Sequence, residues 1–328
     1  MPILSAGLAR AASTGLALAT FAALALAACG PAAQPTSRVL LIGIDGVRPD
    51  VLTEVPTPNI DALAASGWYT AEARTTTPSV SGPSWSSMLT GVWPEKHGVT
   101  NNNFTGRDYD TWPSFLIRAE RERPELSTFA ALDWLPLAEL PEGGPVVPAT
   151  VDERAVLDGY EHGWAEGDGQ VTAQAVRHLG EADPDAMFVY LGNPDETSHQ
   201  HGSIGVEYRA AIALADRHVG MLIDAVRARP GYANEDWLVL ISTDHGRRED
   251  GGHGGDSPEE MTIFILASGL GAGGPGDAGD PGGAGNTAGW PPPGPAYIVD
   301  IAPTALAHLG FAIDPAWGLD GRPLGERR

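Results

Sequence analysis

Carboxylate and imidazole side chains gather directly after three apolar runs of the chain. The residues are, in chain order, Asp45, Asp195, His199, Asp244, His245 and His253. Aspartate oxygen and histidine nitrogen in mixed sets are ligands that suit zinc, and three protein ligands per ion leave a position open for substrate. Six residues of this kind therefore suffice for two ions. Two cations roughly 3.5–4 Å apart can hold both the attacking and the leaving oxygen of an in-line displacement.

Ser81 is the hydroxyl that could act as a nucleophile beside such ions. It lies in the run Ser-Gly-Pro-Ser, which we predict as a turn just ahead of a helical segment at 85–89 that ends at Gly91. Free N–H groups and the dipole at a helix N-terminus attract an anion. A serine alcohol is a poor nucleophile at neutral pH, but coordination to zinc helps to deprotonate it. The pattern therefore predicts attack by Ser81 on a phosphorus or sulfur centre.

Each of these features also has a simpler interpretation. The serine run could be a polar loop that caps an ordinary helix, and an aspartate after a strand is common in tight turns. Asp195 with His199 could form a solvated turn, and His201 competes with His199 when spacing alone is considered. Other hydroxyls precede Ser81, namely those of Thr75, Thr76, Thr77 and Ser79. A metal site is favoured because it explains all three acidic strand ends together.

The elements that must position these residues are strands without polar alternation. The runs 38–44, 186–192 and 237–242 are almost entirely apolar, as in central parallel strands that are covered on both faces. Parallel strands end at one edge of a sheet, where open α/β folds place their sites. Further strands are predicted at 68–74, 126–132 and 261–267, and helices at 57–67, 85–89, 111–123, 168–179, 205–229 and 299–309. This alternation predicts an α/β fold with a mostly parallel central sheet sandwiched by helices on both faces.

The length and charge of the chain limit its organisation and its partners. The chain has 328 residues, of which 38–328 fit a single large α/β domain with an irregular, substrate-side insertion at about 104–165. With 20 basic against 42 acidic residues, the net charge of −22 argues against a nucleic-acid polymer as partner. A small phosphorylated substrate stays compatible with this charge, because bound metal ions dominate the field in a site. The sequence leaves the oligomeric state open.

The N-terminal segment is typical of an exported protein. Residues 1–29 combine Arg10 with an apolar run at 11–28 that no acidic residue interrupts, as in a signal peptide. Leu26-Ala27-Ala28-Cys29 resembles the lipobox of bacterial lipoproteins, in which the cysteine is acylated and becomes the mature N-terminus. We therefore expect a protein of the cell envelope that is lipid-anchored to a bacterial membrane at Cys29, with 30–37 as a tether. A retained anchor helix is the competing interpretation.

Several longer motifs carry a resemblance to a known family. They are GIDGVRPD, LTGVWPEKHGV, PDETSHQHG, STDHG, VDIAPTALAHLG and DGRPL, and they run from Val39 to about Leu324. Together they resemble the alkaline phosphatase superfamily and, within it, the type I phosphodiesterase/nucleotide pyrophosphatase branch. The resemblance implies two zinc ions, with other divalent metals possible. One ion would be bound by Asp45, Asp244 and His245, and the other by Asp195, His199 and His253.

The same resemblance implies catalytic roles for two further residues. The family's nucleophile, usually a threonine, falls on Ser81, and its phosphate-binding asparagine falls on Asn102. Asn102, together with the backbone N–H of Ser81 or Gly82, would stabilise the charge that develops on the transferred group. The implied reaction is hydrolysis of phosphate esters, expected to be phosphodiesters or nucleotide pyrophosphates, through a phosphoseryl intermediate.

The chain departs from this family in two places. The run Ser81-Gly82-Pro83-Ser84-Trp85 stands where the diesterases carry Thr-Phe-Pro-Asn-His, and it is closer to the Cys/Ser-x-Pro-x-Arg pattern of sulfatases. Trp85 occupies the arginine position of that pattern, so conversion to formylglycine is not expected. His253 lies nearer to His245 than the third histidine of the family does. The alternatives are a sulfatase-like, phosphomonoester or phosphonate hydrolase, or a surface binding lipoprotein with a degenerate site.

Overall fold

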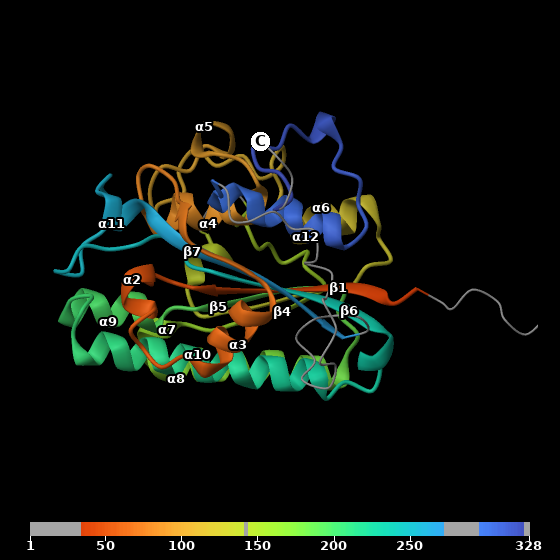
Figure 1. The fold of residues 1–328 in the computed structure, drawn as a ribbon. Helices are drawn as coiled ribbons and strands as arrows, with labels where there is room; N and C mark the ends of the chain where they lie inside the picture. The colour runs from red at the N-terminus through yellow and green to blue at the C-terminus, as the bar shows by residue number, and fades with distance from the viewer. Residues whose placement is uncertain (1–33, 141–143, 272–294, 325–328) are drawn as a thin grey trace, which may run out of the picture. The chain divides into compact units, whose positions relative to one another are not determined.

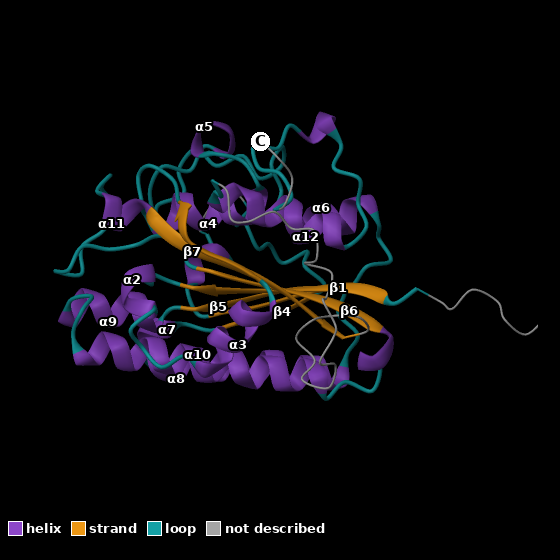
Figure 2. Cartoon of the chain, in the orientation of Figure 1, coloured by secondary structure: helices purple, strands orange, loops and turns teal. Residues whose placement is uncertain are grey.

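A seven-stranded sheet in the order β2-β7-β6-β1-β5-β3-β4 lies at the centre of the residues that the structure describes (Figure 1, Figure 2). The structure is a computed structural model that describes residues 34–140, 144–271 and 295–324. Its strands are β1 (Thr36–Ile44), β2 (Trp68–Arg74), β3 (Thr128–Leu132), β4 (Glu153–Val156), β5 (Ala186–Leu191), β6 (Glu235–Ser242) and β7 (Thr262–Gly271). The pairs β1–β5, β1–β6, β3–β5 and β3–β4 are parallel, whereas β7 runs antiparallel to β6 and β2. The predicted mostly parallel sheet is confirmed.

Strand β1 shows why its sequence lacks alternation. Val39 and Leu41 pack into the apolar layer on one face of the sheet, and Leu40 and Ile42 pack into the layer on the other. All four side chains have no exposed surface. A strand that is covered on both faces needs apolar residues at successive positions. β1 therefore lies in the middle of the core, and the residue that follows it lies at the edge of the sheet.

Helices cover both faces of the sheet, as predicted (Figure 2). One layer holds α4 (Ser81–Thr90), α6 (Phe115–Glu122) and α12 (Ile301–His308), whose buried residues share a core with Leu41. The opposite layer holds α3 (Pro58–Ser66), α8 (Trp164–Glu181) and α10 (Val206–Arg227), which pack against Leu40 and Ile42. The shorter helices are α2 (Pro49–Leu52), α5 (Pro94–His97), α7 (Gly159–His162), α9 (Asn193–His201) and α11 (Pro258–Met261).

Several local predictions were wrong. The run at Ser81 is not a turn ahead of a helix, because α4 begins at Ser81 itself after the extended residue Val80. The polar segment after β5, for which no helix was predicted, is helix α9 rather than a solvated turn. Strand β4 was missed because it is a short edge strand with no buried residue. The range 104–165, expected to be irregular, contains long loops with the predicted helix α6 and strand β3, and also β4 and α7, which were not predicted.

Some sequence predictions fall on parts that the structure does not describe. The signal peptide and Cys29 lie outside the described residues, as does the glycine-rich range 272–294. From Thr36 onward the chain forms one compact unit. None of the helices in the described ranges is long and apolar enough to cross a membrane.

Candidate active site

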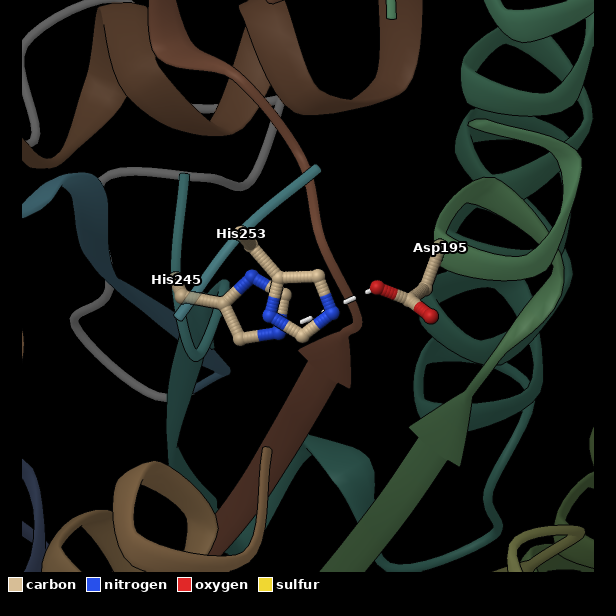
Figure 3. Close-up of side chains that lie close together, drawn as sticks. All are labelled: Asp195, His245 and His253. Atoms are coloured by element: carbon tan, nitrogen blue, oxygen red, sulfur yellow. Dashed lines mark ion pairs between the residues drawn. The ribbon is translucent and has the colours of Figure 1, made fainter. Parts of the chain in front are cut away.

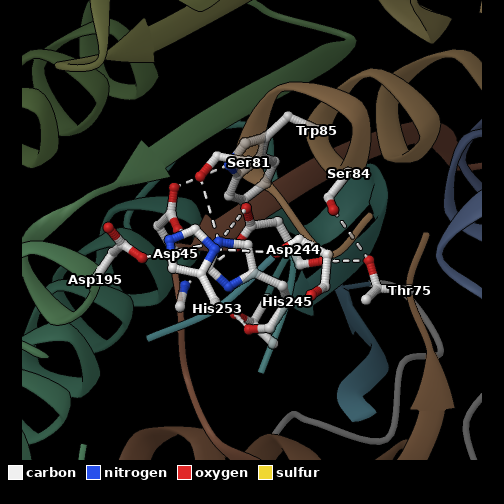
Figure 4. A network of polar contacts seen from close by, with 12 residues as sticks. Asp45, Thr75, Ser81, Ser84, Trp85, Asp195, Asp244, His245 and His253 are labelled. Carbon is white, nitrogen blue, oxygen red and sulfur yellow. Dashed lines mark hydrogen bonds and ion pairs between the residues drawn. The ribbon is translucent and has the colours of Figure 1, made fainter. Parts of the chain in front are cut away.

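Three neighbouring strands bring the predicted ligands together at one edge of the sheet (Figure 4). β1 lies between β5 and β6, so the residues that follow these strands meet. Asp45 follows β1, Asp244 and His245 follow β6, and α9 after β5 carries Asp195 and His199. His253 reaches the same place from the loop before α11, and Ser81 reaches it from the start of α4.

Asp45, Asp244 and His245 form the first half of the site. His245 Nε2 lies 3.4 Å from Asp244 Oδ2 and 3.6 Å from Asp45 Oδ1. Among the described residues, these two carboxylate oxygens accept no hydrogen bond although both are buried. One ligand atom from each of the three residues can be chosen so that all lie within 4.8 Å of one another. Unpartnered buried oxygens beside an imidazole nitrogen are what a divalent cation would satisfy, so the residues fit a metal ion.

The electrostatics of this half point to the same conclusion. Burial, together with the charges of Asp244 and Asp195, raises the pKa of Asp45 well above its usual range. Burial and the charge of Asp195 raise the pKa of Asp244 to about 7. Carboxylates that are buried side by side resist ionisation unless a cation compensates them. A bound cation would remove this cost.

The ring of His245 is oriented to present a lone pair to the site. Its Nδ1 lies 3.0 Å from the carbonyl oxygen of Gly246, which can only accept, so we assign the proton to Nδ1. Burial and the neighbouring His253 ring lower the pKa of His245, so the ring is neutral. Nε2 is therefore free to bind a metal ion, as in sites where a backbone carbonyl fixes the tautomer of a ligand.

Ser81 lies beside this first half. Its Oγ is 3.3 Å from His245 Nε2, and the residue is 5% exposed. The competing hydroxyls are engaged elsewhere: Thr75 Oγ1 donates to the carbonyl of Asp244, and Ser79 Oγ donates to that of Gly255. Ser81 is therefore the hydroxyl of this segment that faces the cluster of ligands (Figure 4).

Asn102 is held at the start of α4. Gly82 N–H donates to Asn102 Oδ1 at 2.7 Å, which turns the amide nitrogen of the exposed Asn102 side chain away from the helix. Any side chain at position 82 would meet the carbonyl oxygen of Asn101 at 2.7 Å, so glycine is needed for this close approach. We expected the backbone N–H of Ser81 or Gly82 to face the substrate. The N–H of Gly82 is already used, and it orients Asn102 instead.

Asp195, His199 and His253 form the second half of the site. Asp195 and His199 are one helical turn apart on α9, and Asp195 Oδ2 lies 3.2 Å from His199 Nε2. His253 Nε2 lies 3.2 Å from the same His199 nitrogen, while its Nδ1 lies 3.0 Å from the carbonyl oxygen of Ser79. Asp195 and His253 also form a ligand group with His245, whose ring stacks on that of His253 (Figure 3). The predicted ligand His199 joins neither of these two groups, and neither does His201, which is exposed at the end of α9.

Sequence reasoning missed three residues that touch the ligands. Trp85 Nε1 and the Tyr190 hydroxyl donate to Asp45 Oδ2 at 3.0 and 2.7 Å, which leaves Oδ1 for the site. The guanidinium of Arg247 contacts both Asp195 and His199. An available signal for Arg247 was its position directly after Asp244-His245-Gly246 at the end of a buried strand.

Comparisons with known proteins agree with this geometry. A family model described as type I phosphodiesterase / nucleotide pyrophosphatase matches residues 39–249. Ectonucleotide pyrophosphatase/phosphodiesterase family member 7 of Rattus norvegicus is 27% identical over 238 residues, which are 65% of this chain and 50% of the relative. The chain thus spans about half the length of that relative.

Two solved structures show the same fold. The 2-O GAG sulfatase BT1596 matches with a TM-score of 0.65 and 13% identity over 89% of this chain and 76% of its own. Human ectonucleotide pyrophosphatase/phosphodiesterase 5 matches with a TM-score of 0.62 and 14% identity over 85% of this chain and 96% of its own.

Proposed function

Because the chain belongs to the type I phosphodiesterase/nucleotide pyrophosphatase family, we propose that it hydrolyses small phosphodiesters or nucleotide pyrophosphates. Ser81 would be the nucleophile at a site for two divalent cations, and zinc is the expected metal. The observation that carries the proposal is the position of Ser81 Oγ at the start of α4, 3.3 Å from His245 Nε2. It faces buried carboxylate oxygens that accept no hydrogen bond from the residues that the structure describes.

Different residues of the chain have different roles in the proposed reaction. Asp45, Asp244 and His245 would hold one cation, and Asp195, His199 and His253 would hold the other. When bound, the cations supply positive charge that attracts an anionic phosphate and lowers the pKa of a hydroxyl that they contact. Ser81 Oγ then forms a bond to phosphorus while the bond from phosphorus to the leaving oxygen breaks. Water hydrolyses the resulting phosphoseryl group and frees Ser81 for another cycle.

Two features would stabilise the transferred phosphoryl group. The N-terminus of α4 directs its dipole at the position of Ser81. Asn102 presents its amide nitrogen, because Gly82 N–H holds Oδ1 at 2.7 Å. A donor fixed before the reaction stabilises charge without reorganising, which is the most effective form of such help.

The substrate is expected to be small. A net charge of −22 disfavours a polyanion such as nucleic acid, whereas a single phosphodiester group can be drawn to bound cations. The fold that this chain shares with a sulfatase, and its Ser81-Gly82-Pro83-Ser84-Trp85 run, favour sulfate or phosphonate esters as a second candidate class of substrate.

Side-by-side turnover of aryl phosphodiester, phosphomonoester, phosphonate and sulfate substrates tests the proposal. Protein truncated before Gly30 and loaded with zinc should cleave the diester fastest. Preference for the sulfate ester would favour the second class of substrate. Protein that is folded but retains no metal after purification at neutral pH, and cleaves none of the substrates, would contradict the proposal and favour a binding lipoprotein.

The location of the protein is a separate proposal. The lipobox sequence at Leu26–Cys29 supports export and anchoring through acylated Cys29. Labelling with a radioactive fatty acid should mark the full chain and not a Cys29→Ala variant. Equal label in both chains, or in neither, would contradict the anchor.

A further inference from the structure

Arg247 is a fully buried cation that no role in the proposed reaction uses. It follows Gly246 after β6, and its side chain has no exposed surface. Nη1 lies 2.9 Å from Asp195 Oδ1 and donates to the carbonyl oxygen of Asp195 at 2.6 Å, and it also contacts Ser198 Oγ. Arginine is almost never buried without partners, and here its partners belong to α9. Arg247 therefore fastens the helix that carries Asp195 and His199 to the end of β6.

The second terminal nitrogen of Arg247 reaches a proposed metal ligand. Nη2 lies 2.8 Å from His199 Nε2. The same ring nitrogen faces Asp195 Oδ2 and His253 Nε2, each at 3.2 Å. A neutral imidazole nitrogen has one lone pair, which can accept an N–H or bind a metal ion but not both. A cation that binds His199 through Nε2, the nitrogen beside Asp195 and His253, must therefore displace Arg247 Nη2.

The charge around Asp195 differs from that around Asp45 and Asp244. The carboxylate of Asp195 lies 2.9 Å from the guanidinium of the buried Arg247, so its charge is balanced by a cation of the chain. An arginine stays protonated inside proteins, so this compensation is present before any metal binds. The carboxylates of Asp45 and Asp244 have no such partner among the described residues.

We propose that the Arg247 guanidinium permanently balances the negative charge of the Asp195–His199 half of the site. A divalent metal ion therefore binds this half more weakly than the Asp45–Asp244 half, and it must first displace Arg247 from His199. The inference rests on the proposed two-metal function. Because both terminal nitrogens of Arg247 are engaged and the side chain is buried, it is a positioning residue that does not reach the substrate.

Zinc titration by calorimetry tests this inference. The wild-type chain from Gly30 onward should bind two zinc ions with clearly different affinities. Arg247→Met keeps much of the volume without the charge and should tighten the weaker zinc, because the ion no longer has to displace a cation. The expected change is about tenfold to 100-fold, which is the size, though not the direction, of the usual effect of replacing a residue that contacts a ligand. Arg247→Lys should keep the difference between the two ions. Arg248→Met is the matched control, because Arg248 is half-exposed and pairs with Glu260 away from the ligands.

A second readout covers the case in which metal-free Arg247→Met does not fold. Zinc-loaded protein is mixed with a chelator, and the release of each ion is followed. Arg247→Met should release its faster ion more slowly than the wild type does, whereas Arg248→Met should not change. Two zinc ions of equal affinity in the wild type, with unchanged release in Arg247→Met, would overturn this inference and leave the proposed function standing. A folded wild type that binds no zinc would overturn both.

Discussion

The two halves of the site use the same types of ligand but compensate their charge in different ways. In the Asp45–Asp244 half, one oxygen of each carboxylate accepts no hydrogen bond among the described residues, and neither aspartate has an arginine or lysine beside it there. Burial and neighbouring carboxylates raise the pKa of each aspartate. Asp195 Oδ1 also accepts no hydrogen bond in the described ranges, but it lies beside a cation. In the Asp195–His199 half, the buried guanidinium of Arg247 already pairs with the carboxylate. On our proposal, one half therefore needs an added cation, whereas the other already contains the guanidinium of Arg247.

The supporting contacts follow the same division. Asp45 Oδ2 receives two hydrogen bonds from Trp85 and Tyr190, which fix the carboxylate and aim Oδ1 at the site. These donors are neutral, so they orient the aspartate without neutralising it. In the other half the orienting donor is itself charged. Substitutions of Trp85 or Tyr190 therefore change only the orientation of a carboxylate, whereas a substitution of Arg247 also changes the charge of the site.

Ser81→Ala should have the largest effect, because it removes the proposed nucleophile, which faces the first half. We expect diester turnover to fall by several orders of magnitude, as it does when the nucleophile of a hydrolase is removed. Zinc content and the thermal unfolding midpoint should stay unchanged, since the Ser81 hydroxyl supports no other element. Activity close to that of the wild type would move the nucleophile to another hydroxyl.

Asn102→Ala should have the next largest effect on catalysis. If Asn102 stabilises developing charge, its loss lowers kcat by about 10²–10³-fold, or about 2.7–4 kcal/mol, with little change in KM. Steady-state kinetics with an aryl phosphodiester measure both constants. Asn103→Ala, at the exposed neighbouring position, is the matched control. An unchanged kcat for Asn102→Ala would remove this residue from the site.

Trp85→Phe sharpens the contrast between the halves. The change removes one neutral donor to Asp45 and should weaken zinc binding in the first half by about tenfold, because residues that orient ligands have effects of this size. The weaker zinc ion should be unaffected. Tyr190→Phe removes the other donor to the same oxygen and should behave alike in calorimetry. Unchanged affinity in both variants would show that orientation of Asp45 contributes little.

Much of this arrangement could be predicted from the sequence, and the exceptions have physical reasons. β1, β5 and β6 were found because strands that are covered on both faces are apolar at successive positions, and their ends place Asp45, Asp195 and Asp244 at one edge. Helix α9 was missed although Pro194 stands in its first turn, a position where proline favours helices.

Other features depend on contacts that no local pattern encodes. Arg247 is buried only because α9 supplies Asp195 and Ser198 as partners from a distant part of the chain. The role of Trp85 was likewise hidden, because a tryptophan in the middle of a helix is ordinarily a core residue. Its indole N–H meets Asp45 only after β1 and α4 pack together.

A second buried acidic pair offers a smaller, pH-dependent test behind the Asp195–His199 half. Asp168 accepts from the backbone N–H of Gly192 at 2.7 Å, at the start of α9, and the carboxyl groups of Asp133 and Asp168 face each other. Burial raises the pKa of Asp133 to about 7. The folded chain therefore holds a proton that the unfolded chain releases near pH 4, so this pair lowers stability as the pH rises from about 4 to 7.

Asp133→Asn should remove that pH dependence, because the amide donates a hydrogen bond without titrating. We compare the free energy of unfolding of the variant with that of the wild type at each pH. This difference should shift in favour of the variant by about 1 kcal/mol or more from pH 5 to pH 8. Urea unfolding at the two pH values measures it. Asp314→Asn is the control, because the exposed Asp314 side chain caps a short helix by accepting from the N–H of Ala316. An equal difference at both pH values would contradict the shared proton.

The most direct test of the contrast between the halves is the free energy of unfolding of the metal-free protein, measured by urea denaturation with a chelator present. Asp244→Asn should stabilise the metal-free chain, because it removes one of several crowded carboxylates. Asp195→Asn should destabilise it by about 3–5 kcal/mol, because it leaves the buried charge of Arg247 without its partner. Opposite signs of the two changes in unfolding free energy would support an Asp45–Asp244 half that lacks a cation and an Asp195–His199 half that already contains one. Effects of the same sign and similar size would contradict that account.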